Sequence, residues 1–459
     1  MILKDTIAAI ATPVGVGGIG IIRVSGPLSE EITHLLFKSR KQVDKLMTHH
    51  LYHGDIISPG TGAVLDEVMI SLMRGPHSYT GEDILEINCH GGPLILQTVL
   101  GEIIKAGARP AEPGEFTRRA FLNNRLDLSQ AEAVADVIMA KTERSLEAAV
   151  SHLRGELAEK IGPLRASIID ILAVLETSID FSEEDIDIGR NPEIVGMIQA
   201  VLDDLQAILA TYERGKLYRY GINAVITGKP NVGKSSLLNR LLGEKRAIVT
   251  PVPGTTRDFI EESIVIKGIP VRLTDTAGIR QPGNIIEQEG IAMVREKLSL
   301  ADVVIIVLDG SGVLTEEDIE VIEENRARKA VLVINKKDLP QIMNIGEVHR
   351  LTPDLNPLCI SAKYGDGIPA LEEVIYRLVM ERQENCQETT MISNIRHKMS
   401  LEKTTLLLSQ AKDGIENGLS PELPALDVRE ALGSLGEIAG KTVNEEILDR
   451  IFATFCIGK

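Results

Sequence analysis

A glycine-rich octapeptide at residues 228–235 carries the clearest chemistry in the sequence. It reads Gly-Lys-Pro-Asn-Val-Gly-Lys-Ser and fits G-x-x-x-x-G-K-[ST], the phosphate-binding loop of nucleoside triphosphatases. Gly228 and Gly233 allow backbone N–H groups to turn inward around a polyanion. Lys234 can reach the β- and γ-phosphates, and Ser235 offers a hydroxyl to Mg²⁺. We therefore predict that this segment binds a nucleoside triphosphate.

The residues on both sides of the octapeptide support this prediction. The apolar run 223–227 predicts a buried strand, and 235–242 predicts a helix whose N-terminus receives the phosphate. A glycine-rich turn without such a role would need neither neighbour. From the loop and the first helical turn, the expected nucleotide contacts are Asn231, Val232, Gly233, Lys234, Ser235 and Ser236.

A second motif, Asp-Thr-Ala-Gly at 275–278, follows the apolar run 271–274. A carboxylate at a strand end can hold Mg²⁺ through water, which assigns that role to Asp275. The backbone N–H of Gly278 can approach the γ-phosphate. This motif adds four expected nucleotide contacts, Asp275, Thr276, Ala277 and Gly278.

Two further motifs indicate guanine as the base. Asn-Lys-Lys-Asp at 335–338 ends the predicted strand 330–334, and Asp338 can accept from both the ring N–H and the exocyclic amine of guanine. Adenine would leave that carboxylate unpaired, at a cost of roughly 1–3 kcal/mol. Ser-Ala-Lys at 361–363 follows the apolar residues 358–360 and resembles the loop that meets the guanine carbonyl. The expected base contacts are Asn335, Lys336, Asp338, Ser361, Ala362 and Lys363.

The catalytic group is not the usual one. In the best-known small GTPases a Gln after D-x-x-G positions the attacking water, whereas Ile279 stands there in this chain. The segment 250–258 reads Thr-Pro-Val-Pro-Gly-Thr-Thr-Arg-Asp and precedes the D-x-x-G motif by a distance that suits a switch loop. In this segment Thr256 is the candidate second hydroxyl ligand of Mg²⁺. Arg257 could act as an arginine finger in cis or form a local ion pair with Asp258.

Composition limits the function classes. The 459 residues exceed one hydrophobic core, so about two to four domains are expected. With 49 basic and 66 acidic residues the net charge is −17, which argues against a surface that tracks nucleic acid throughout. The four Cys form no C-x-x-C pair, which suits a reducing cytosol. The N-terminus lacks a signal peptide, and the apolar run 303–308 is too short to span a bilayer, so we predict a cytoplasmic location without a membrane.

The spacing of apolar residues and of turn residues along the chain predicts a multidomain α/β protein with four segments. Residues 1–120 read as an α+β domain, and residues 121–215 as the first half of a helical domain. Residues 217–380 form the Ras-like, doubly wound, mostly parallel GTPase domain, and 381–459 return to helical spacing with a loop at 418–424. We therefore expect the GTPase domain to be inserted into a helical bundle.

Three details qualify this division. The bare G-x-G-x-x-G at 15–20 is not read as a dinucleotide site, because the next residues, 21–24, predict a strand and not a helix. In the helical part, apolar residues from Leu146 to Leu175 recur every three or four positions. Gly162-Pro163 is expected to interrupt that run, which favours a bundle over an extended coiled coil. The acidic segment 181–187 favours a surface loop over a metal site.

The chain ends in Cys-Ile-Gly-Lys at 456–459, which is not a prenylation signal. Together with the GTPase motifs this ending resembles the bacterial MnmE (TrmE) family of tRNA uridine-modification GTPases, and the resemblance runs from end to end. The further motifs that carry it lie at 11–15, 17–26, 79–83, 90–93, 113–123, 126–133 and 254–258.

The resemblance implies a homodimer formed through the N-terminal domain. It also implies binding of 5,10-methylenetetrahydrofolate as one-carbon donor, for which 5-formyl-tetrahydrofolate is an analogue. Arg23, Glu82, Arg125 and Lys459 match the folate-contact positions. Arg and Lys can pair with the glutamate tail of a folate, and a Glu can accept from the pterin N–H groups.

The resemblance also implies that K⁺ replaces an arginine finger between the phosphates. Asn231 matches the K⁺-ligating side chain, and Thr250, Val252 and Thr255 match the loop that completes the shell. Glu287 matches the residue that orients water, with Glu289 as its rival. Lys234 supplies the phosphate-binding charge in the same catalytic unit.

The family acts on tRNA with a flavin-bearing partner of the MnmG (GidA) type, which holds FAD and completes a heterotetramer. Together they place a carboxymethylaminomethyl or aminomethyl group on carbon five of the wobble uridine. Cys456 matches a candidate participant, by nucleophilic or structural means. The alternative is a switch of the ribosome-assembly type, which reads RNA through a basic domain that this chain lacks.

Overall fold

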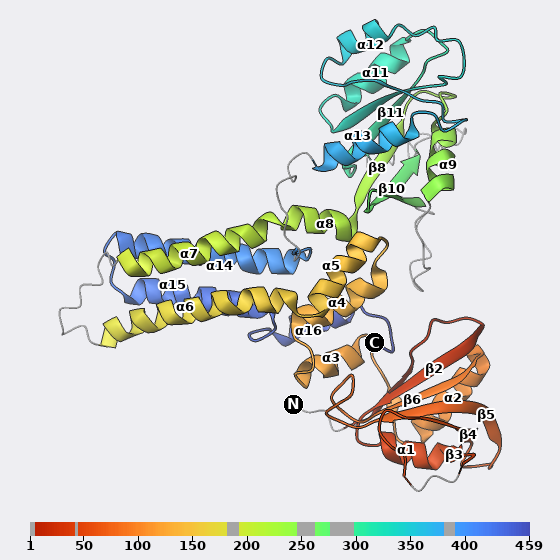
Figure 1. The fold of residues 1–459 in the computed structure, drawn as a ribbon, viewed down its shortest axis with the longest axis vertical. Helices are drawn as coiled ribbons and strands as arrows, with labels where there is room; N and C mark the ends of the chain where they lie inside the picture. Colours follow the sequence, from red (N-terminus) through yellow and green to blue (C-terminus); the bar gives the residue numbers. More distant parts are fainter. Residues whose placement is uncertain (1–4, 42–44, 181–191, 246–261, 276–297, 381–390) are drawn as a thin grey trace, which may run out of the picture. The chain divides into compact units, whose positions relative to one another are not determined.

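The computed structural model describes residues 5–41, 45–180, 192–245, 262–275, 298–380 and 391–459 (Figure 1). The chain separates into two compact units. Unit 1 comprises Met1–Ile138, Ser151–Val201 and Leu406–Lys459, and unit 2 comprises Met139–Val150 and Leu202–Thr405.

Unit 1 begins with a seven-stranded sheet in the order β3-β4-β5-β6-β2-β1-β7. Neighbouring strands are antiparallel except for the parallel pair β1 and β7. Residues 21–24 lie in a strand, as expected. The bounds are β1 Ile7–Ile10, β2 Gly17–Ser25, β3 Phe37–Ser39, β4 Leu51–Ile57, β5 Val64–Met73, β6 Ile84–Gly91 and β7 Arg109–Pro110.

Two helices pack against this sheet and form a hydrophobic core with it. They are α1 (Ser29–Leu36) and α2 (Pro93–Lys105). In α2 the apolar residues at positions 96, 99 and 103 share one face and are fully buried or nearly so. They pack against strand residues such as Ile22 and Ile87. Two short helices then follow, α3 (Glu115–Leu122) and α4 (Leu128–Met139).

The helical part of unit 1 contains α6 (Glu156–Asp180) and α15 (Glu422–Ile438), which lie side by side although far apart in sequence (Figure 1). The expected interruption at Gly162-Pro163 is wrong, because α6 runs through Pro163. A proline inside a helix costs about 3 kcal/mol, whereas each fully buried Leu or Ile contributes roughly 1.5–3 kcal/mol. The face that outweighs the proline consists of Ile161, Leu164, Ile168, Ile171 and Leu175.

The actual break in the apolar run lies at Gly155. This residue has φ 87° and follows α5 (Glu143–Leu153), where a left-handed glycine ends a helix without strain. The loop predicted at 418–424 is shorter, because α14 (Ile395–Glu416) ends just before it and α15 already begins at Glu422. Pro424 lies in the first turn of α15, where a proline loses no helical hydrogen bond.

Among the described residues, one helical stretch, Pro192–Tyr220, is long and apolar enough to cross a membrane by length and composition alone. It contains α7 (Pro192–Ala210) and α8 (Tyr212–Tyr220). A core helix passes the same test, so the finding is weak evidence for a span. The helix is amphipathic, since its buried residues recur at helical spacing as Ile194, Ile198, Val201, Leu205 and Ile208.

Unit 2 contains a six-stranded sheet in the order β13-β12-β11-β8-β10-β9. All neighbouring strands are parallel except the edge pair β9 and β10. This is the doubly wound sheet predicted for the GTPase motifs. The bounds are β8 Ile222–Thr227, β9 Glu262–Ile266, β10 Ile269–Asp275, β11 Val303–Asp309, β12 Ala330–Asn335 and β13 Leu358–Cys359.

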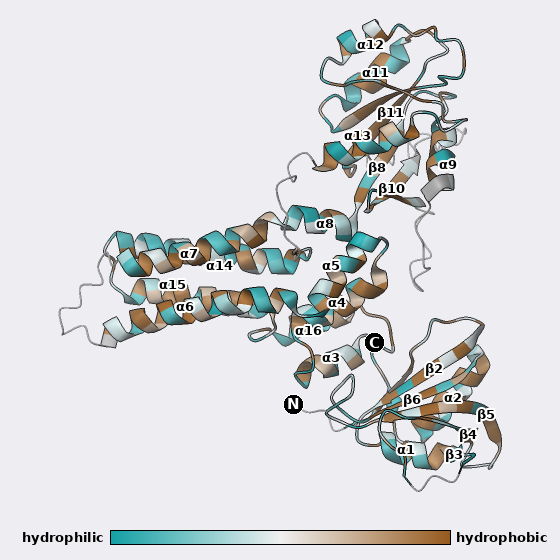
Figure 2. Cartoon of the chain, in the orientation of Figure 1, coloured by the Kyte–Doolittle hydropathy of each residue, from teal (hydrophilic) through white to brown (hydrophobic). Residues whose placement is uncertain are grey.

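Helices cover both faces of this sheet, and the central strands are therefore mostly apolar (Figure 2), with polar residues near their ends such as Asn223, Asp309 and Asn335. One face packs against α9 (Lys234–Lys245) and α13 (Ile368–Met380). The other packs against α11 (Glu316–Asn325) and α12 (Ile345–Leu351). In such a sheet the loops after the parallel strands meet at one edge, where ligands bind.

Candidate functional site

The phosphate loop lies between β8 and α9, as its sequence predicted. Gly228 has φ 147° and Gly233 has φ 99°, values that favour glycine. A Cβ atom at Gly228 would overlap the carbonyl oxygen of Val307, and one at Gly233 would overlap the side-chain amide of Asn335. Both glycines are therefore required by close packing as well as by backbone conformation.

The ammonium group of Lys234 is held at this loop. Its Nζ donates to the carbonyl oxygens of Gly228 and Lys229, both at 2.8 Å, and the side chain is buried. Ser235 and Ser236 follow in the first turn of α9, and both are exposed. Asn231 is also exposed and has φ 64°. The residue types and the helix N-terminus suit a polyphosphate with its Mg²⁺, since a hydroxyl is a ligand that Mg²⁺ accepts.

Asn335 connects the phosphate loop to the third base motif. Its Nδ2 donates to the carbonyl oxygen of Val232 at 2.8 Å, and its Oδ1 accepts from the backbone N–H of Ala362 at 3.0 Å. The side chain is only 3% exposed. One buried amide therefore fixes the distance between the expected phosphate and base contacts.

The base motif has a fixed carboxylate. Asp338 Oδ1 accepts from the hydroxyl of Ser361 at 2.6 Å, which joins the second and third base motifs. Lys336 has φ 65°, and its Nζ donates to Asp309 Oδ2 at 2.6 Å. Burial raises the pKa of Asp309, but the hydrogen bonds and charge of Lys336 and Ser311 outweigh it and lower the pKa overall.

Two residues that support this site, Arg240 and Asp309, were not identified by the sequence motifs. Arg240 on α9 donates to the carbonyl oxygens of Ala362, at 3.2 Å, and of Lys363. Asp309 holds Lys336 from the end of β11. Both act on motif backbone or on a motif side chain from another element, so no short local pattern marks them.

The other predicted residues of the nucleotide site are only partly described. Asp275 ends β10, and its backbone pairs with Ile226 of β8, so it lies beside the phosphate loop. The residues that lie outside the described part of the chain are Thr250, Val252, Thr255, Thr256, Thr276, Ala277, Gly278 and Glu287.

A second polar site lies in unit 1, where the chain end meets the sheet. Arg23 on β2 donates from Nε and Nη2 to Glu86 Oε1, at 2.9 and 2.7 Å, and from Nη1 to the carbonyl oxygen of Gly458 at 3.3 Å. A Cβ at Gly458 would lie 2.7 Å from the carbonyl oxygen of Ile10, so only glycine passes this closely. Burial, and then the nearby charge of Arg23, lower the pKa of Lys459.

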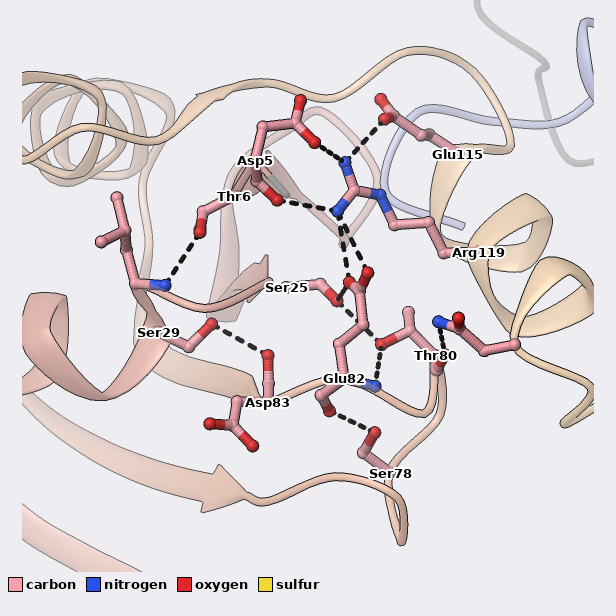
Figure 3. A network of polar contacts seen from close by, with 12 residues as sticks. Asp5, Thr6, Ser25, Ser29, Ser78, Thr80, Glu82, Asp83, Glu115 and Arg119 are labelled. Carbon is pink, nitrogen blue, oxygen red and sulfur yellow. Dashed lines mark hydrogen bonds and ion pairs between the residues drawn. The ribbon is translucent and has the colours of Figure 1, made fainter. Parts of the chain in front are cut away.

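Glu82 belongs to a neighbouring buried network, drawn in Figure 3. Its Oε2 accepts from Ser25 Oγ at 2.7 Å and from Arg119 Nη1 at 3.2 Å. Arg119 Nη2 also donates to Asp5 Oδ1 at 2.8 Å and to Glu115 Oε1 at 3.1 Å. With 2% exposure Arg119 is the central cation of the network, and the sequence did not single it out.

The remaining predicted residues of unit 1 are placed differently. Arg125 Nε donates to the carbonyl oxygen of Ser78 at 3.0 Å. Cys456 is exposed, and its carbonyl oxygen accepts from the backbone N–H groups of Gly114 and Lys459. Of the four predicted folate contacts, Arg23 and Lys459 are therefore neighbours. Arg23, Glu82 and Arg125 each also form hydrogen bonds to other protein groups. No group of three or more potential metal-ligating side chains occurs in the described residues.

Comparison with known proteins gives matches over the whole chain. The model of the MnmE helical domain matches residues 128–456, and that of the GTP-binding protein TrmE N-terminus matches residues 6–125. A tRNA modification GTPase MnmE from Syntrophus aciditrophicus is 56% identical over 457 residues, and one from Carboxydothermus hydrogenoformans is 48% identical over 460 residues. In both matches 100% of this chain and 100% of the relative are covered.

Among solved structures, the G domain of the T. maritima FeoB iron transporter is 26% identical to this chain. The match covers 34% of this chain and 98% of that one, with a TM-score of 0.27. The family assignment therefore comes from the full-length relatives and the two family models.

Proposed function

The chain belongs to the MnmE family of tRNA modification GTPases, and on that premise we propose that it is a K⁺-activated GTPase that modifies the wobble uridine of tRNA. The observation that carries the proposal is full-length identity of 56% to a relative of that name, combined with guanine and phosphate motifs joined by Asn335. The product is the carboxymethylaminomethyl or aminomethyl form at carbon five.

The nucleotide site of the proposal uses the described loop. Lys234 neutralises phosphate charge, and Ser235 and Thr256 hold Mg²⁺ with Asp275 acting through water. Asp338 selects guanine. Bound Mg²⁺ supplies charge stabilisation at the phosphates, and Ser235 lies at the start of α9, where the helix N-terminus faces the phosphate loop.

A potassium ion would supply the charge that an arginine finger gives elsewhere. Asn231 offers a side-chain oxygen from an exposed position in the phosphate loop. Its partners in the proposed K⁺ shell are Thr250, Val252 and Thr255, and Glu287 orients the attacking water. Ile279 at the usual glutamine position has no polar group for that role, which supports this assignment.

The folate part of the proposal rests on unit 1. Arg23 and Lys459 place two cations close together beside one carboxylate, Glu86, so this corner suits the anionic tail of 5,10-methylenetetrahydrofolate. Glu82 and Arg125 contact the same ligand in this proposal, after exchanging part of their present hydrogen bonds. Cys456 is exposed next to this chain end, where it takes a nucleophilic or a structural role.

We further propose a cytoplasmic homodimer that forms a heterotetramer with a flavin-containing partner of the MnmG type and acts on tRNA. FAD belongs to the partner. The domain division that goes with it is 1–120 for folate binding and dimerisation, 121–215 and 381–459 for the helical domain, and 217–380 for an inserted GTPase domain. The pairing of α6 with α15, from either side of the insertion, supports this division.

Mass spectrometry of wobble nucleosides tests the proposal. Total tRNA from a strain that lacks the gene should lose the modified uridine, and re-expression of the chain should restore it. A Lys234→Ala variant should fail to restore it, because the phosphate-binding charge is gone. Unchanged modification in the deletion strain would favour the rival assignment, a ribosome-assembly switch without modifying activity.

A further inference from the structure

The phosphate loop contains a second lysine, Lys229, whose side chain binds another element. Its Nζ donates to Asp318 Oδ2 at 2.7 Å and to Thr315 Oγ1 at 3.2 Å. Thr315 is the N-cap of α11, and Asp318 is the third residue of that helix. The side chain of Lys229 is 18% exposed and that of Asp318 is fully buried. A loop that must fit phosphate is therefore tied to the start of a core helix.

The carboxylate of Asp318 makes this tie strong. Its Oδ2 accepts from the backbone N–H of Thr315 at 3.0 Å and from the Thr315 hydroxyl at 2.8 Å, which completes a capping box. Its Oδ1 is buried and accepts no hydrogen bond within the described residues. A buried carboxylate with an incomplete set of donors depends heavily on its cation, and Lys229 is the cation it contacts in the described part of the chain.

Lys229 also contacts the catalytic lysine through its backbone. The carbonyl oxygen of Lys229 accepts from Lys234 Nζ at 2.8 Å, as does that of Gly228. The position of the Lys229 backbone therefore sets where the Lys234 ammonium is held. A continuous series of contacts runs from Asp318 through Lys229 to Lys234.

We propose that Lys229 and Asp318 are positioning residues for nucleotide binding. The pair fixes the first turn of the phosphate loop so that the Lys234 ammonium is already placed for the β- and γ-phosphates when GTP arrives. Neither side chain contacts the nucleotide in this proposal. This proposal rests on the proposed GTPase function. It adds two residues that position the phosphate loop for nucleotide binding.

Charge-removing variants test the pair in the full-length chain. Lys229→Met leaves Asp318 as an uncompensated buried charge, so it should lower both the unfolding temperature and the affinity for fluorescent GDP and GTP, the latter at least tenfold. Lys229→Arg keeps the charge and should stay within about twofold of the wild type. The measurements are thermal unfolding, equilibrium nucleotide titration, and kcat and KM for GTP hydrolysis.

The double variant Lys229→Met/Asp318→Asn separates positioning from stability. The carboxamide that replaces the Asp318 carboxylate can still accept from Thr315, and no buried charge is left unpaired, so the unfolding temperature should recover. Nucleotide affinity should stay at least tenfold below the wild type, because the loop is no longer held. Recovery of affinity together with stability would overturn the proposal, and so would wild-type affinity in Lys229→Met.

Two further measurements make the outcome unambiguous. Arg377→Met breaks an exposed ion pair with Glu373, 2.8 Å long, on α13 of the same unit and should change neither property. Wild-type GTP binding and hydrolysis are measured alongside. A wild type that binds no GTP refutes the proposed function and the pair together, whereas an active wild type with unaffected Lys229 variants refutes the pair alone.

Discussion

Asn335 donates its side-chain N–H to the carbonyl oxygen of Val232 at 2.8 Å, and this single hydrogen bond joins the guanine motif to the phosphate loop. The two residues are 103 positions apart in the chain. The same amide accepts from Ala362, so three of the four sequence motifs meet at one buried side chain. Correct spacing between base and phosphate contacts thus depends on Asn335.

Replacement of Asn335 by Ala should therefore weaken binding of the whole nucleotide. The carbonyl oxygen of Val232 and the N–H of Ala362 would lose their partner, and an unsatisfied buried group costs about 1–3 kcal/mol. We expect the Kd for GDP to rise tenfold or more in an equilibrium titration. Asn335→Asp should bind no better than the Ala variant, because its carboxylate repels the Val232 oxygen. Near-wild-type affinity in Asn335→Ala would show that the two loops hold their spacing without it.

Asp338→Asn should change the base preference. The carboxylate accepts two hydrogen bonds from guanine in our proposal, whereas a carboxamide offers one acceptor and one donor. Loss of a paired acceptor costs about 1–3 kcal/mol, so GTP affinity should fall roughly 5- to 150-fold. Xanthosine triphosphate, with a carbonyl oxygen in place of the exocyclic amine, should gain. Competition titrations with both nucleotides measure this change in base preference. An unchanged ratio of the two affinities would exclude Asp338 from base recognition.

GTP hydrolysis should be faster in K⁺ than in Na⁺ at matched ionic strength. The reason is that Ile279 supplies no water-orienting group and Asn231 offers an exposed oxygen in the phosphate loop. Asn231→Ala should remove the difference between the two salts. Asn239→Ala, an exposed position on α9 outside the phosphate loop, is the matched control and should keep the difference. Equal wild-type rates in both salts would refute the potassium assignment.

Unit 1 should lose stability in acid because of the Arg119 network. Burial raises the pKa of Asp5 and of Glu115, but hydrogen bonds and charge from Arg109 and Arg119 outweigh it and lower both pKa values below their ordinary 3.8 and 4.5. A carboxyl with a lowered pKa stabilises the fold above its ordinary value and loses that contribution as the pH falls through the lowered one. Chemical denaturation should therefore give a falling free energy of unfolding below about pH 4.5.

Arg119→Met tests the same network at neutral pH. Removal of the central cation leaves Glu82 without the cation that it contacts in the described residues, whereas Asp5 and Glu115 keep Arg109. Breaking a buried pair costs about 3–5 kcal/mol. Arg40→Met, which breaks surface ion pairs with Asp55 and Glu67 in the same unit, should have no measurable effect. Arg119→Met should also flatten the acid transition, because Asp5 and Glu115 then lose part of the charge that lowers their pKa values, while Arg109 remains. An unaltered transition would assign the acid sensitivity to other groups.

Folate binding should weaken at alkaline pH because of Lys459. Burial and Arg23 lower its pKa from the ordinary 10.5, so the ammonium form is lost earlier as the pH rises. Affinity for 5-formyl-tetrahydrofolate should decline as the pH passes through that lowered pKa. Lys459→Arg should hold its affinity over the same range, since a guanidinium does not titrate there. Lys441→Ala, exposed in the same unit, serves as the control. Identical pH profiles for wild type and Lys459→Arg would contradict this assignment.

Local features of this protein could be read from the sequence because a few adjacent residues determine them. The strand before Gly228, the helix after Lys234 and the strands before Asn335 and Ser361 all occur as predicted. Parallel strands with motifs at their carboxyl ends also predict where the motifs meet. The continuity of α6 through Pro163 could not be predicted, since burial of a long apolar face decides it.

The sequence by itself determined the nucleotide motifs, their order and the type of each supporting element, because turns and strand–loop–helix units depend on neighbouring residues. Only the tertiary structure decided which distant groups hold them. Lys229 meets Asp318 across 89 positions, and Arg23 meets the carbonyl oxygen of Gly458 across 435. Such pairs form where the chain path brings charges into a common buried space, and the energy of leaving one unpaired there depends on packing that no local pattern records.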